Sequence, residues 1–562
     1  MKHAVLKIHP KDNVVVALRD LKKGEIISCD GEDYEMLEDI PAKHKFFTGD
    51  VSVSGEIIMY GVLVGRATQD LKRGGLMTTQ NIHHAAEPYK YRGSVYQWTP
   101  PDVSKWKSKT FMGYHRSDGR VGTANYWLFI PTVFCENRNL DVIREAMQNE
   151  LGYGVTDKYV SFTRELVGQY KGQVTRDEGR ENTVDSLQLT DNRQPSTVKR
   201  QQSTANRLFK NVDGIKFLNH QGGCGGTRQD SEILQNLLAA YADHPNVGGV
   251  TILSLGCQHL QSNDFVAAIK KRNPSFDKPL YLFEQQGGMT EEELIKHAIA
   301  STFEGLVEIN RQERKPTGLD KLTVGVKCGG SDGFSGISAN PAVGYFSDLL
   351  VALNGKILLA EFPELCGAEQ ELIDRSVNQS TAEKFIRLMD AYSAQAEKVG
   401  SGFHANPSPG NIRDGLITDA IKSAGACKKG GSSPVIDVLD YTEPATKAGL
   451  NLVCTPGNDV EATTGKAASG AALILFTTGL GTPTGNPVCP TIKLSTNTKL
   501  AHKMPDIIDI DCGPIVDGSA SIQEIGEQIL EYCIKAASGE ITPKSVLLNQ
   551  DDFIPWKRGV SL

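Results

Sequence analysis

Short apolar runs alternate with amphipathic stretches along most of this chain. Runs typical of strands cover residues 126–133, 250–255, 280–283, 322–326 and 356–359. Helical periodicity covers residues 139–151, 230–242 and 264–271. Strands that alternate with helices at this spacing indicate βαβ units around a largely parallel sheet. We therefore predict an α/β fold from residue 110 onward.

The first part of the chain has a different pattern. Residues 14–18 and 57–64 form two short β-branched runs, with turn signals between them. We predict a small β-rich domain over 1–92 and a proline-containing linker over 93–109. Two α/β domains follow in the predicted organisation, each with a largely parallel sheet. They are a middle domain over 110–312, with a polar insertion near 172–206, and a glycine-rich catalytic domain over 318–562.

Composition narrows the range of partners. The 562 residues carry a net charge of −7, which leaves no basic footprint for nucleic acid. No run has the length needed to span a bilayer, and the first residues lack the apolar core of a signal peptide. The eleven cysteines contain no C-x-x-C pair, which is typical of reduced thiols in a cytoplasmic protein. We expect a small-molecule partner, and a homo-oligomer stays open.

Four cysteines stand within glycine-rich turns between residues 222 and 370. They are Cys224, Cys257, Cys328 and Cys366. The turns of Cys257 and Cys328 directly follow predicted strands, and ligands in open α/β sheets bind beyond the carboxyl ends of the strands. One alternative is a polar pocket assembled from several strand-end loops. The other is that each thiol is a small core residue beside a packed turn.

The segment 324–341 is too rich in glycine and small polar residues for a core element. Successive loop N–H groups can bind a carboxylate or phosphate, so we predict that this segment binds a ligand. Further along, Glu361, Glu364 and Glu369 surround Cys366. These carboxylates could ligate a divalent metal or supply an acid and a base. They could equally be acids that favour a helix N-terminus.

Two later loops, 454–459 and 477–487, also have the composition of ligand loops. Between them, Gly465-Lys466-Ala467 fails as a phosphate-binding loop, because Ala467 stands where a magnesium ligand is needed. Among the histidines, the adjacent His83 and His84 could offer imidazoles to a metal. Neighbouring side chains of a strand point to opposite faces, so we expect only one of them to serve.

Together these segments resemble the altronate/galactarate dehydratase family of sugar-acid hydro-lyases, over nearly the whole chain. Residues 10–82 are similar to the family's small SAF domain, and residues 113–125 to its middle-domain entry motif. The C-terminal similarity is the most specific. It comprises Gly329-Gly330-Ser331-Asp332, Ser335-Gly336, Ala339-Asn340-Pro341, Gly367-Ala368-Glu369, Pro409-Gly410-Asn411 and Thr455-Pro456-Gly457-Asn458-Asp459.

The chain departs from the family pattern at three places. Residues 78–81 read Thr-Thr-Gln-Asn where the family usually has His-Thr-His-Asn. Either His83 and His84 compensate, or the metal site differs. Ala124 and Leu480 stand where the family usually has arginine. Because both changes remove positive charge that could hold a substrate carboxylate, they bear on the choice of substrate.

The resemblance implies dehydration of an anionic sugar acid, foremost D-altronate, to a 2-keto-3-deoxy sugar acid, assisted by Fe²⁺ or Mn²⁺. The alternatives are galactarate or another aldarate or aldonate as substrate, an iron–sulfur hydro-lyase using three of the four turn cysteines, and a non-catalytic sugar-acid-binding protein. The expected residues fall into three groups. They are catalytic His44, Lys45, Glu361, Glu364 and Glu369; substrate-binding Gly329, Gly330, Ser331, Asp332, Asn340, Gly457, Asn458 and Asp459; and metal-binding His83, His84, Cys224 and Cys328.

Overall fold

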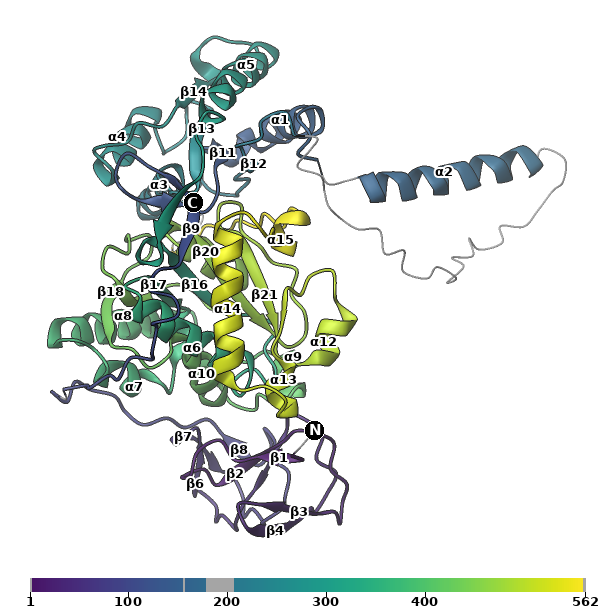
Figure 1. The fold of residues 1–562 in the computed structure, drawn as a ribbon, viewed down its shortest axis with the longest axis vertical. Coiled ribbons are helices and arrows are strands. Elements are labelled where there is room, and N and C mark those ends of the chain that lie inside the picture. The colour runs from purple at the N-terminus through teal and green to yellow at the C-terminus, as the bar shows by residue number, and fades with distance from the viewer. Residues whose placement is uncertain (1–2, 94, 155–156, 178–206, 559–562) are drawn as a thin grey trace.

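The computed structural model describes residues 3–93, 95–154, 157–177 and 207–558. Three units follow one another along the long axis in Figure 1. The N-terminal β-rich domain lies at one end, the C-terminal domain at the centre and the middle domain at the other end. Most of the predicted insertion near 172–206 lies outside the described residues, and its first residues belong to helix α2 (Asp157–Asp177).

The N-terminal domain consists of short antiparallel strands, as predicted. Its strands are β1 (Val5–Leu6), β2 (Val14–Ala17), β3 (Ile26–Cys29), β4 (Glu32–Glu35), β5 (Lys45–Phe47), β6 (Glu56–Met59), β7 (Val62–Ala67) and β8 (Ile82–His83). The predicted run 57–64 is divided between β6 and β7. Tyr60 and Gly61 have φ angles of 58° and 78°, and this left-handed pair makes the tight turn of a hairpin.

The middle domain has a four-stranded parallel sheet in the order β12-β11-β13-β14. These strands are β11 (Tyr126–Pro131), β12 (Gly214–Phe217), β13 (Val247–Ser254) and β14 (Leu280–Glu284). The helices packed with it are α1 (Asn137–Glu150), α3 (Arg228–Ala242), α4 (Ser262–Arg272) and α5 (Glu291–Ile309). The predicted strands and helices of this region are therefore confirmed, with small shifts at their ends.

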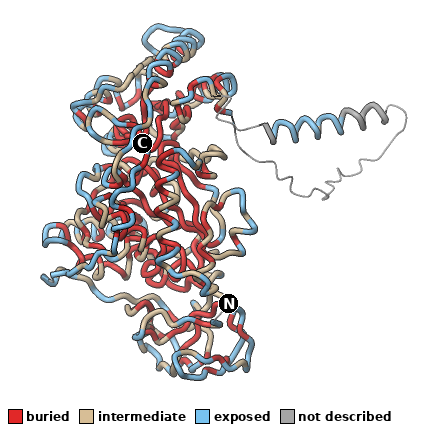
Figure 2. The backbone as a smooth tube through the Cα atoms, in the orientation of Figure 1, coloured by how far each residue is buried: buried red, intermediate tan, exposed pale blue. Residues whose placement is uncertain are grey.

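The C-terminal domain is built on a seven-stranded parallel sheet in the order β18-β19-β17-β16-β20-β21-β22. The strands are β16 (Thr323–Cys328), β17 (Lys356–Ala360), β18 (Val435–Leu439), β19 (Gly449–Val453), β20 (Leu473–Thr478), β21 (Thr491–Ser495) and β22 (Ile510–Asp511). The helices are α6 (Ala339–Ala352), α7 (Glu369–Asp374), α8 (Gln379–Lys398), α9 (Pro409–Arg413), α10 (Asp419–Cys427), α11 (Asp459–Ala468), α12 (Thr498–Lys503), α13 (Gly513–Asp517), α14 (Ile522–Ala537) and α15 (Lys544–Leu547). Figure 2 shows that the buried chain is concentrated in this domain.

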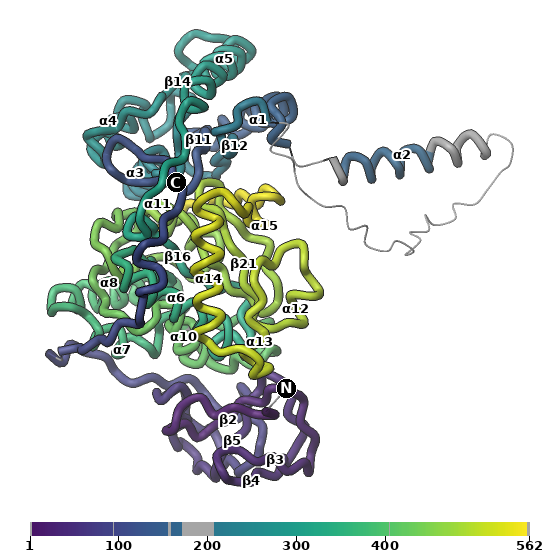
Figure 3. Tube along the Cα trace, viewed as in Figure 1, coloured from purple at the N-terminus to yellow at the C-terminus, as the bar shows by residue number. Residues whose placement is uncertain are grey.

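The two parallel sheets face each other with the amino ends of their strands. Thr123 Oγ1 and Asn246 Nδ2, just before β11 and β13, both donate to the carbonyl oxygen of Ala472, just before β20, each at 2.9 Å. The carboxyl edges therefore point in opposite directions. Figure 3 shows the middle domain and the N-terminal domain at opposite ends of the C-terminal domain. The carboxyl edge of the C-terminal sheet faces the N-terminal domain, because the ammonium of Lys43 meets the carboxylate of Asp332, beyond β16, at 3.1 Å.

The segment predicted as the second domain boundary is itself ordered. Strand β15 (Lys315–Gly318) pairs with β9 (Thr110–His115), which also pairs with β10 (Val121–Gly122). No helix in the described part of the chain is long and apolar enough to cross a membrane.

Candidate functional site

The candidate site lies at the carboxyl edge of the C-terminal sheet. Strand β16 is flanked by β17 on one side and β20 on the other, and the chain runs outward from it in both directions. Such a switch point leaves a crevice between the loops that follow the two neighbouring strands. The loops beyond β16, β17 and β19 carry residues 329–332, 361–369 and 455–459, which the sequence singled out.

A fully buried ion pair stands at the centre of this edge. Lys327, at the end of β16, places its Nζ against the Glu361 carboxylate, and both side chains are completely enclosed. The same Nζ lies 2.9 Å from Asp459 Oδ1, at the start of α11. Gly329 leaves room for this contact, because a Cβ at that position would collide with the Asp459 carboxylate. One lysine thus joins three strand-end loops.

Three more lysines converge on the same carboxylates. Lys422 Nζ lies 2.9 Å from Glu364 Oε1, and Lys429 Nζ lies 2.7 Å from Cys328 Sγ. Lys466 Nζ lies 3.8 Å from Glu361 Oε2, and both of these buried atoms lack a hydrogen-bond partner. We call this set the lysine cluster. It comprises Lys327, Lys422, Lys429 and Lys466 with Cys328, Glu361, Glu364 and Asp459.

The charges of the cluster depend on one another. Burial lowers the pKa of Lys327, but Asp459, Glu361 and Glu364 outweigh this effect and hold its pKa well above the usual value. Burial alone would raise the pKa of Glu364, yet the nearby lysines bring it well below its usual range. By contrast, burial lowers the pKa of Lys466 to about 8. The cluster therefore combines permanent positive charge with one lysine that can lose its proton near neutral pH.

The backbone of Glu361 is in an unusual conformation for a residue with a side chain. Its φ of 74° lies in the left-handed region, which costs roughly 1–2 kcal/mol for a residue other than glycine. Its N–H donates to Thr455 Oγ1 at 3.0 Å, which holds the residue in place. Strain of this kind is concentrated at functional sites.

A second group of ligand-type side chains lies at the interface with the N-terminal domain. His84 Nδ1 contacts the Asp419 carboxylate at the start of α10, and Cys366 completes a group whose ligand atoms all lie within 4.8 Å of one another. Burial raises the pKa of the neighbouring Glu369 to about 7. We call His84, Cys366 and Asp419 the imidazole–thiol–carboxylate site.

The two groups are neighbours in the fold. Asp419 and Lys422 are three residues apart on α10, a spacing that places side chains on one helix face. Glu364 and Cys366 stand on either side of Leu365, where the one-turn helix 362–365 ends. One helix and one loop thus supply both groups.

The family resemblance implies a divalent metal, and the two groups differ in how well they fit one. Cys328, Glu361 and Glu364 also have ligand atoms within 4.8 Å of one another. Their donors, however, are already neutralised by lysine ammonium groups, whose charge opposes a cation. At the imidazole–thiol–carboxylate site, an imidazole nitrogen, a thiol and a carboxylate oxygen lie within 4.8 Å of one another. Nitrogen, sulfur and oxygen donors together suit Fe²⁺ or a similar ion.

Two predicted catalytic residues lie elsewhere on the domain interface. Lys45 is enclosed, and its Nζ donates to the carbonyl oxygens of Gly415 at 2.6 Å and Lys43 at 3.0 Å. His44 is half-buried, burial lowers its pKa, and its Nδ1 lies 3.3 Å from the carbonyl oxygen of Ala42. Lys45 thus docks the N-terminal domain on Gly415, His44 contacts its own domain, and neither belongs to the lysine cluster.

Lys45 gives the stability of the protein a specific pH dependence, because burial lowers its pKa to about 7. Between about pH 7 and about pH 10.4, the unfolded chain binds more protons here than the folded chain does. The free energy of unfolding should therefore rise with pH by up to about 1.4 kcal/mol per unit. Denaturant titrations at several pH values should show that the free energy of unfolding of the wild type rises with pH relative to that of Lys45→Met. Parallel curves for the two proteins would contradict this assignment.

Several predicted substrate-binding residues have structural partners. Asp332 accepts from Thr496 Oγ1 at 3.0 Å, and Asn340 donates to the carbonyl oxygen of Gly425 at 3.0 Å. Asn458 caps α11 by accepting from the N–H groups of Val460 and Glu461. In the loop between β16 and α6, Gly330 has a φ of 57°, and the buried hydroxyl of Ser331 has no hydrogen-bond partner. Asp459 belongs to the lysine cluster through its contact with Lys327. Gly457 lies beside the cluster, because a Cβ at this position would stand 3.6 Å from Glu364 Cγ.

The predicted metal residues are not brought together. His84 and Cys328 fall in the two different groups described above, and His83 and Cys224 belong to neither. His83 is exposed, and Cys224 is exposed on the middle domain. None of the four lysines was predicted as a site residue by itself, although Lys327 lies in the predicted ligand segment 324–341 and Lys466 in the motif rejected as a phosphate-binding loop. Three of them stand on helices or just beyond one, where a lysine is usually a surface residue, and no local motif marks them.

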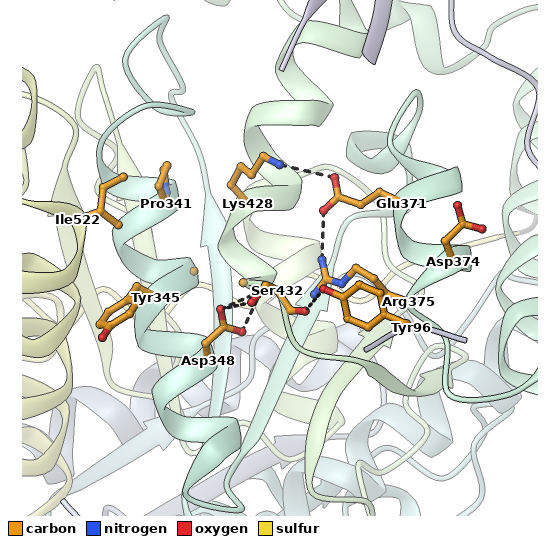
Figure 4. A pocket seen from close by; sticks show the side chains of 12 residues that line it. Tyr96, Pro341, Tyr345, Asp348, Glu371, Asp374, Arg375, Lys428, Ser432 and Ile522 are labelled. Atoms are coloured by element: carbon orange, nitrogen blue, oxygen red, sulfur yellow. Dashed lines mark hydrogen bonds and ion pairs between the residues drawn. The ribbon is translucent and has the colours of Figure 1, made fainter. Parts of the chain in front are cut away.

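Two surface pockets are lined mainly by residues of the C-terminal domain. The pocket in Figure 4, about 480 Å³, is lined by Asp348 and Arg375. Their charges are satisfied within the wall, because Asp348 accepts from Ser432 and Arg375 donates to the carbonyl oxygen of Ser433. The other pocket, about 490 Å³, is lined by Asn406, Gly457 and Asn458. It adjoins the lysine cluster, since Asn406 Nδ2 lies 3.5 Å from Glu364 Oε1 and Asn406 Oδ1 accepts from Lys422 at 2.6 Å.

Three family models match successive parts of the chain. The altronate/galactarate dehydratase SAF domain matches residues 3–85. The D-galactarate dehydratase/altronate hydrolase second domain matches residues 113–310. The D-galactarate/altronate dehydratase C-terminal domain matches residues 319–561.

Curated relatives match over almost the full length. Altronate dehydratase of Bacillus subtilis is 32% identical, with 99% of each chain covered, and altronate dehydratase of Escherichia coli is 30% identical with the same coverage. Galactarate dehydratase (L-threo-forming) of Escherichia coli is 29% identical, over 95% of this chain and 93% of the relative. This chain belongs to the altronate/galactarate dehydratase family.

Proposed function

We propose that this protein is a hydro-lyase that converts a sugar acid, foremost D-altronate, into a 2-keto-3-deoxy sugar acid. The observation that carries the proposal is the lysine cluster beside a metal-type site at one sheet edge. The Lys422 ammonium group, which is partly exposed at this edge, suits an anionic substrate in a protein whose net charge is negative. Full-length relatives named altronate dehydratase support D-altronate over galactarate as the first choice.

The pocket beside Asn406 and Gly457 is the proposed substrate pocket. Its volume of about 490 Å³ lies within the usual range for small-molecule sites. Lys422, which donates to Asn406 of the pocket wall, has a side chain that is 10% exposed, and Asp459, which follows Asn458 of the wall, is 30% exposed. Lys422 can pair with the substrate carboxylate, while Asp459 and the amides of the 457–459 loop can orient its hydroxyl groups.

The proposed metal ligands are His84, Cys366 and Asp419. A divalent ion such as Fe²⁺ or Mn²⁺ held there supplies a Lewis acid that stabilises negative charge on substrate oxygen. The protein's own contribution is to hold these donors at the domain interface, next to Lys422 on the same helix. The N-terminal domain, docked against this edge through Lys45 and Lys43, also excludes water.

The proton lost from the carbon next to the carboxylate needs an acceptor, and the departing C3 hydroxyl needs a donor. We assign the movement of this proton to the facing pair Lys466 and Glu361, which act through the lysine cluster because both side chains are enclosed. Their unpartnered atoms are 3.8 Å apart, and burial lowers the pKa of Lys466 to about 8. A neutral lysine is a competent base, and the adjacent carboxyl can pass the proton on.

The pH profile of kcat/KM tests this assignment. If Lys466 must be neutral to accept a proton, activity rises as pH increases through about 8. Lys466→Met should lower kcat on the order of 10²–10⁴-fold and abolish that limb of the profile. Lys428→Met is the matched control, because Lys428 is a partly exposed neighbour that pairs with Glu371 instead. An unchanged limb in Lys466→Met would assign the base elsewhere.

A substrate panel tests the function itself. Hexonates and aldarates are supplied in turn with Fe²⁺ or Mn²⁺, and formation of 2-keto-3-deoxy acid is measured. We expect turnover with D-altronate. Turnover with galactarate alone would show that galactarate is the substrate and would leave the type of reaction, dehydration, unchanged. Failure with every sugar acid would contradict the dehydratase proposal and favour a sugar-acid-binding protein.

A further inference from the structure

Three exposed cysteines follow three neighbouring strands of the middle-domain sheet. Cys135 lies four residues beyond β11, Cys224 follows β12 and Cys257 follows β13. Strand β11 lies between the other two in the sheet. The chain passes from β11 to one side and then to the other, so the three thiols surround the switch point of this sheet, where ligands of open α/β sheets bind.

Backbone hydrogen bonds tie the three loops together. The N–H of Phe134 donates to the carbonyl oxygen of Gly222 at 3.0 Å, and the N–H of His259 donates to that of Gly223 at 3.3 Å. Gly223 has a φ of 98°, and a Cβ there would collide with the carbonyl oxygen of Thr132. This close approach brings the cysteine-bearing turns side by side.

Polar side chains border the same edge. The carboxyl of Glu136, next to Cys135, is fully buried; its Oε2 accepts from Asn139 Nδ2 at 2.8 Å, and its Oε1 has no hydrogen-bond partner. Gln286, beyond β14, donates from Nε2 toward Cys257 Sγ at 3.4 Å. A side-chain amide aimed at a cysteine sulfur is an interaction that tunes metal-bound thiolates.

The spacing of the thiols bears on what they hold. A tetrahedral zinc ion with Zn–S bonds of about 2.3 Å requires sulfur atoms about 3.8 Å apart. Among the described residues, no group of ligand atoms within 4.8 Å of one another contains these three sulfurs. At least one pair of these sulfur atoms therefore lies more than 4.8 Å apart.

We propose that Cys135, Cys224 and Cys257 hold an iron–sulfur cluster at the carboxyl edge of the middle-domain sheet. The three thiols bind iron as thiolates and release their protons to solvent. The cluster lies at the edge that points away from the lysine cluster. Two of the four turn cysteines, Cys224 and Cys257, are ligands of the proposed iron–sulfur cluster. The other two, Cys328 and Cys366, lie in the C-terminal domain, so Cys135 is the third ligand.

The test measures iron and acid-labile sulfide in full-length protein purified without oxygen and reconstituted with ferrous iron and sulfide. We expect visible absorbance from sulfur-to-iron charge transfer and sulfide bound in proportion to iron. Cys135→Ser, Cys224→Ser and Cys257→Ser should each lose most of the sulfide. Cys29→Ser, in the N-terminal domain, should retain it.

Sulfide is the decisive readout, because a single ion at the imidazole–thiol–carboxylate site contains none. Iron without sulfide in the wild-type protein would overturn the proposal. Full sulfide retention in any of the three serine variants would do the same. All three cysteines are exposed, so the variants should keep the wild-type melting temperature, which is measured alongside. Neither result bears on sugar-acid turnover, which the substrate panel tests separately.

Discussion

Replacing Lys327 by methionine should destabilise the protein by about 3–5 kcal/mol and abolish turnover. The substitution leaves the Glu361 carboxylate buried without its closest counter-charge, and an uncompensated buried charge is costly. It also releases Asp459, which Lys327 holds at 2.9 Å. Denaturant unfolding and the substrate assay measure the two effects on the same preparation.

A second substitution separates charge from packing. Lys327→Met combined with Glu361→Gln removes both members of the ion pair, so part of the lost stability should return while activity stays absent. Lys22→Met provides the control, because Lys22 pairs with Asp39 on the open surface and its loss should leave the melting temperature nearly unchanged. A Lys327→Met protein as stable as the Lys22→Met control would contradict the buried-pair description.

Replacing His84 by alanine should remove the bound divalent metal and lower kcat/KM on the order of 10³-fold, as expected when a Lewis acid worth several kcal/mol is lost. His84 supplies the only nitrogen donor of its group. Metal analysis after equilibration with Fe²⁺ or Mn²⁺ gives the stoichiometry. Treating the wild type with a chelator should reproduce the loss of activity, and added metal should restore it.

His83 is a matched control, since it is the adjacent histidine, is exposed and belongs to neither ligand group. His83→Ala should keep both metal and activity. The pair of variants also resolves the ambiguity left by the sequence, in which either histidine could have compensated for the missing His-Thr-His stretch. Loss of metal in His83→Ala, with retention in His84→Ala, would contradict the site.

The sequence predicted what local pattern determines. Strands such as 250–255 have the apolar character of a buried parallel strand, and their ends were identified within a few residues. Glu361, Glu364 and the 329–332 loop were chosen because they follow such strands, and all of them reach the sheet edge. The hairpin at Tyr60 and Gly61 was missed, because an apolar run conceals a turn made by left-handed backbone.

What could not be predicted depends on contacts between distant residues. Lys422, Lys429 and Lys466 become site residues only because α10 and α11 aim them at carboxylates on other loops. A lysine on a helix carries no local sign of burial. Cys135 lacks the glycine-rich surroundings that drew attention to the other cysteines, and only the strand order places it beside Cys224. Conversely, Asn340 and Asn458 were predicted to bind substrate because they belong to motifs shared with the family. Their side chains instead form hydrogen bonds with the protein's own backbone.

The central claim is that this chain removes water from a sugar acid through loss of the proton next to the carboxylate. The most direct measurement is NMR of the product formed from D-altronate in D₂O with Fe²⁺ or Mn²⁺ supplied. The mechanism predicts a 2-keto-3-deoxy acid with one deuterium at C3, because the enol left after dehydration takes its new hydrogen from solvent. Unchanged D-altronate, or a product whose C3 carries no deuterium, would contradict the account.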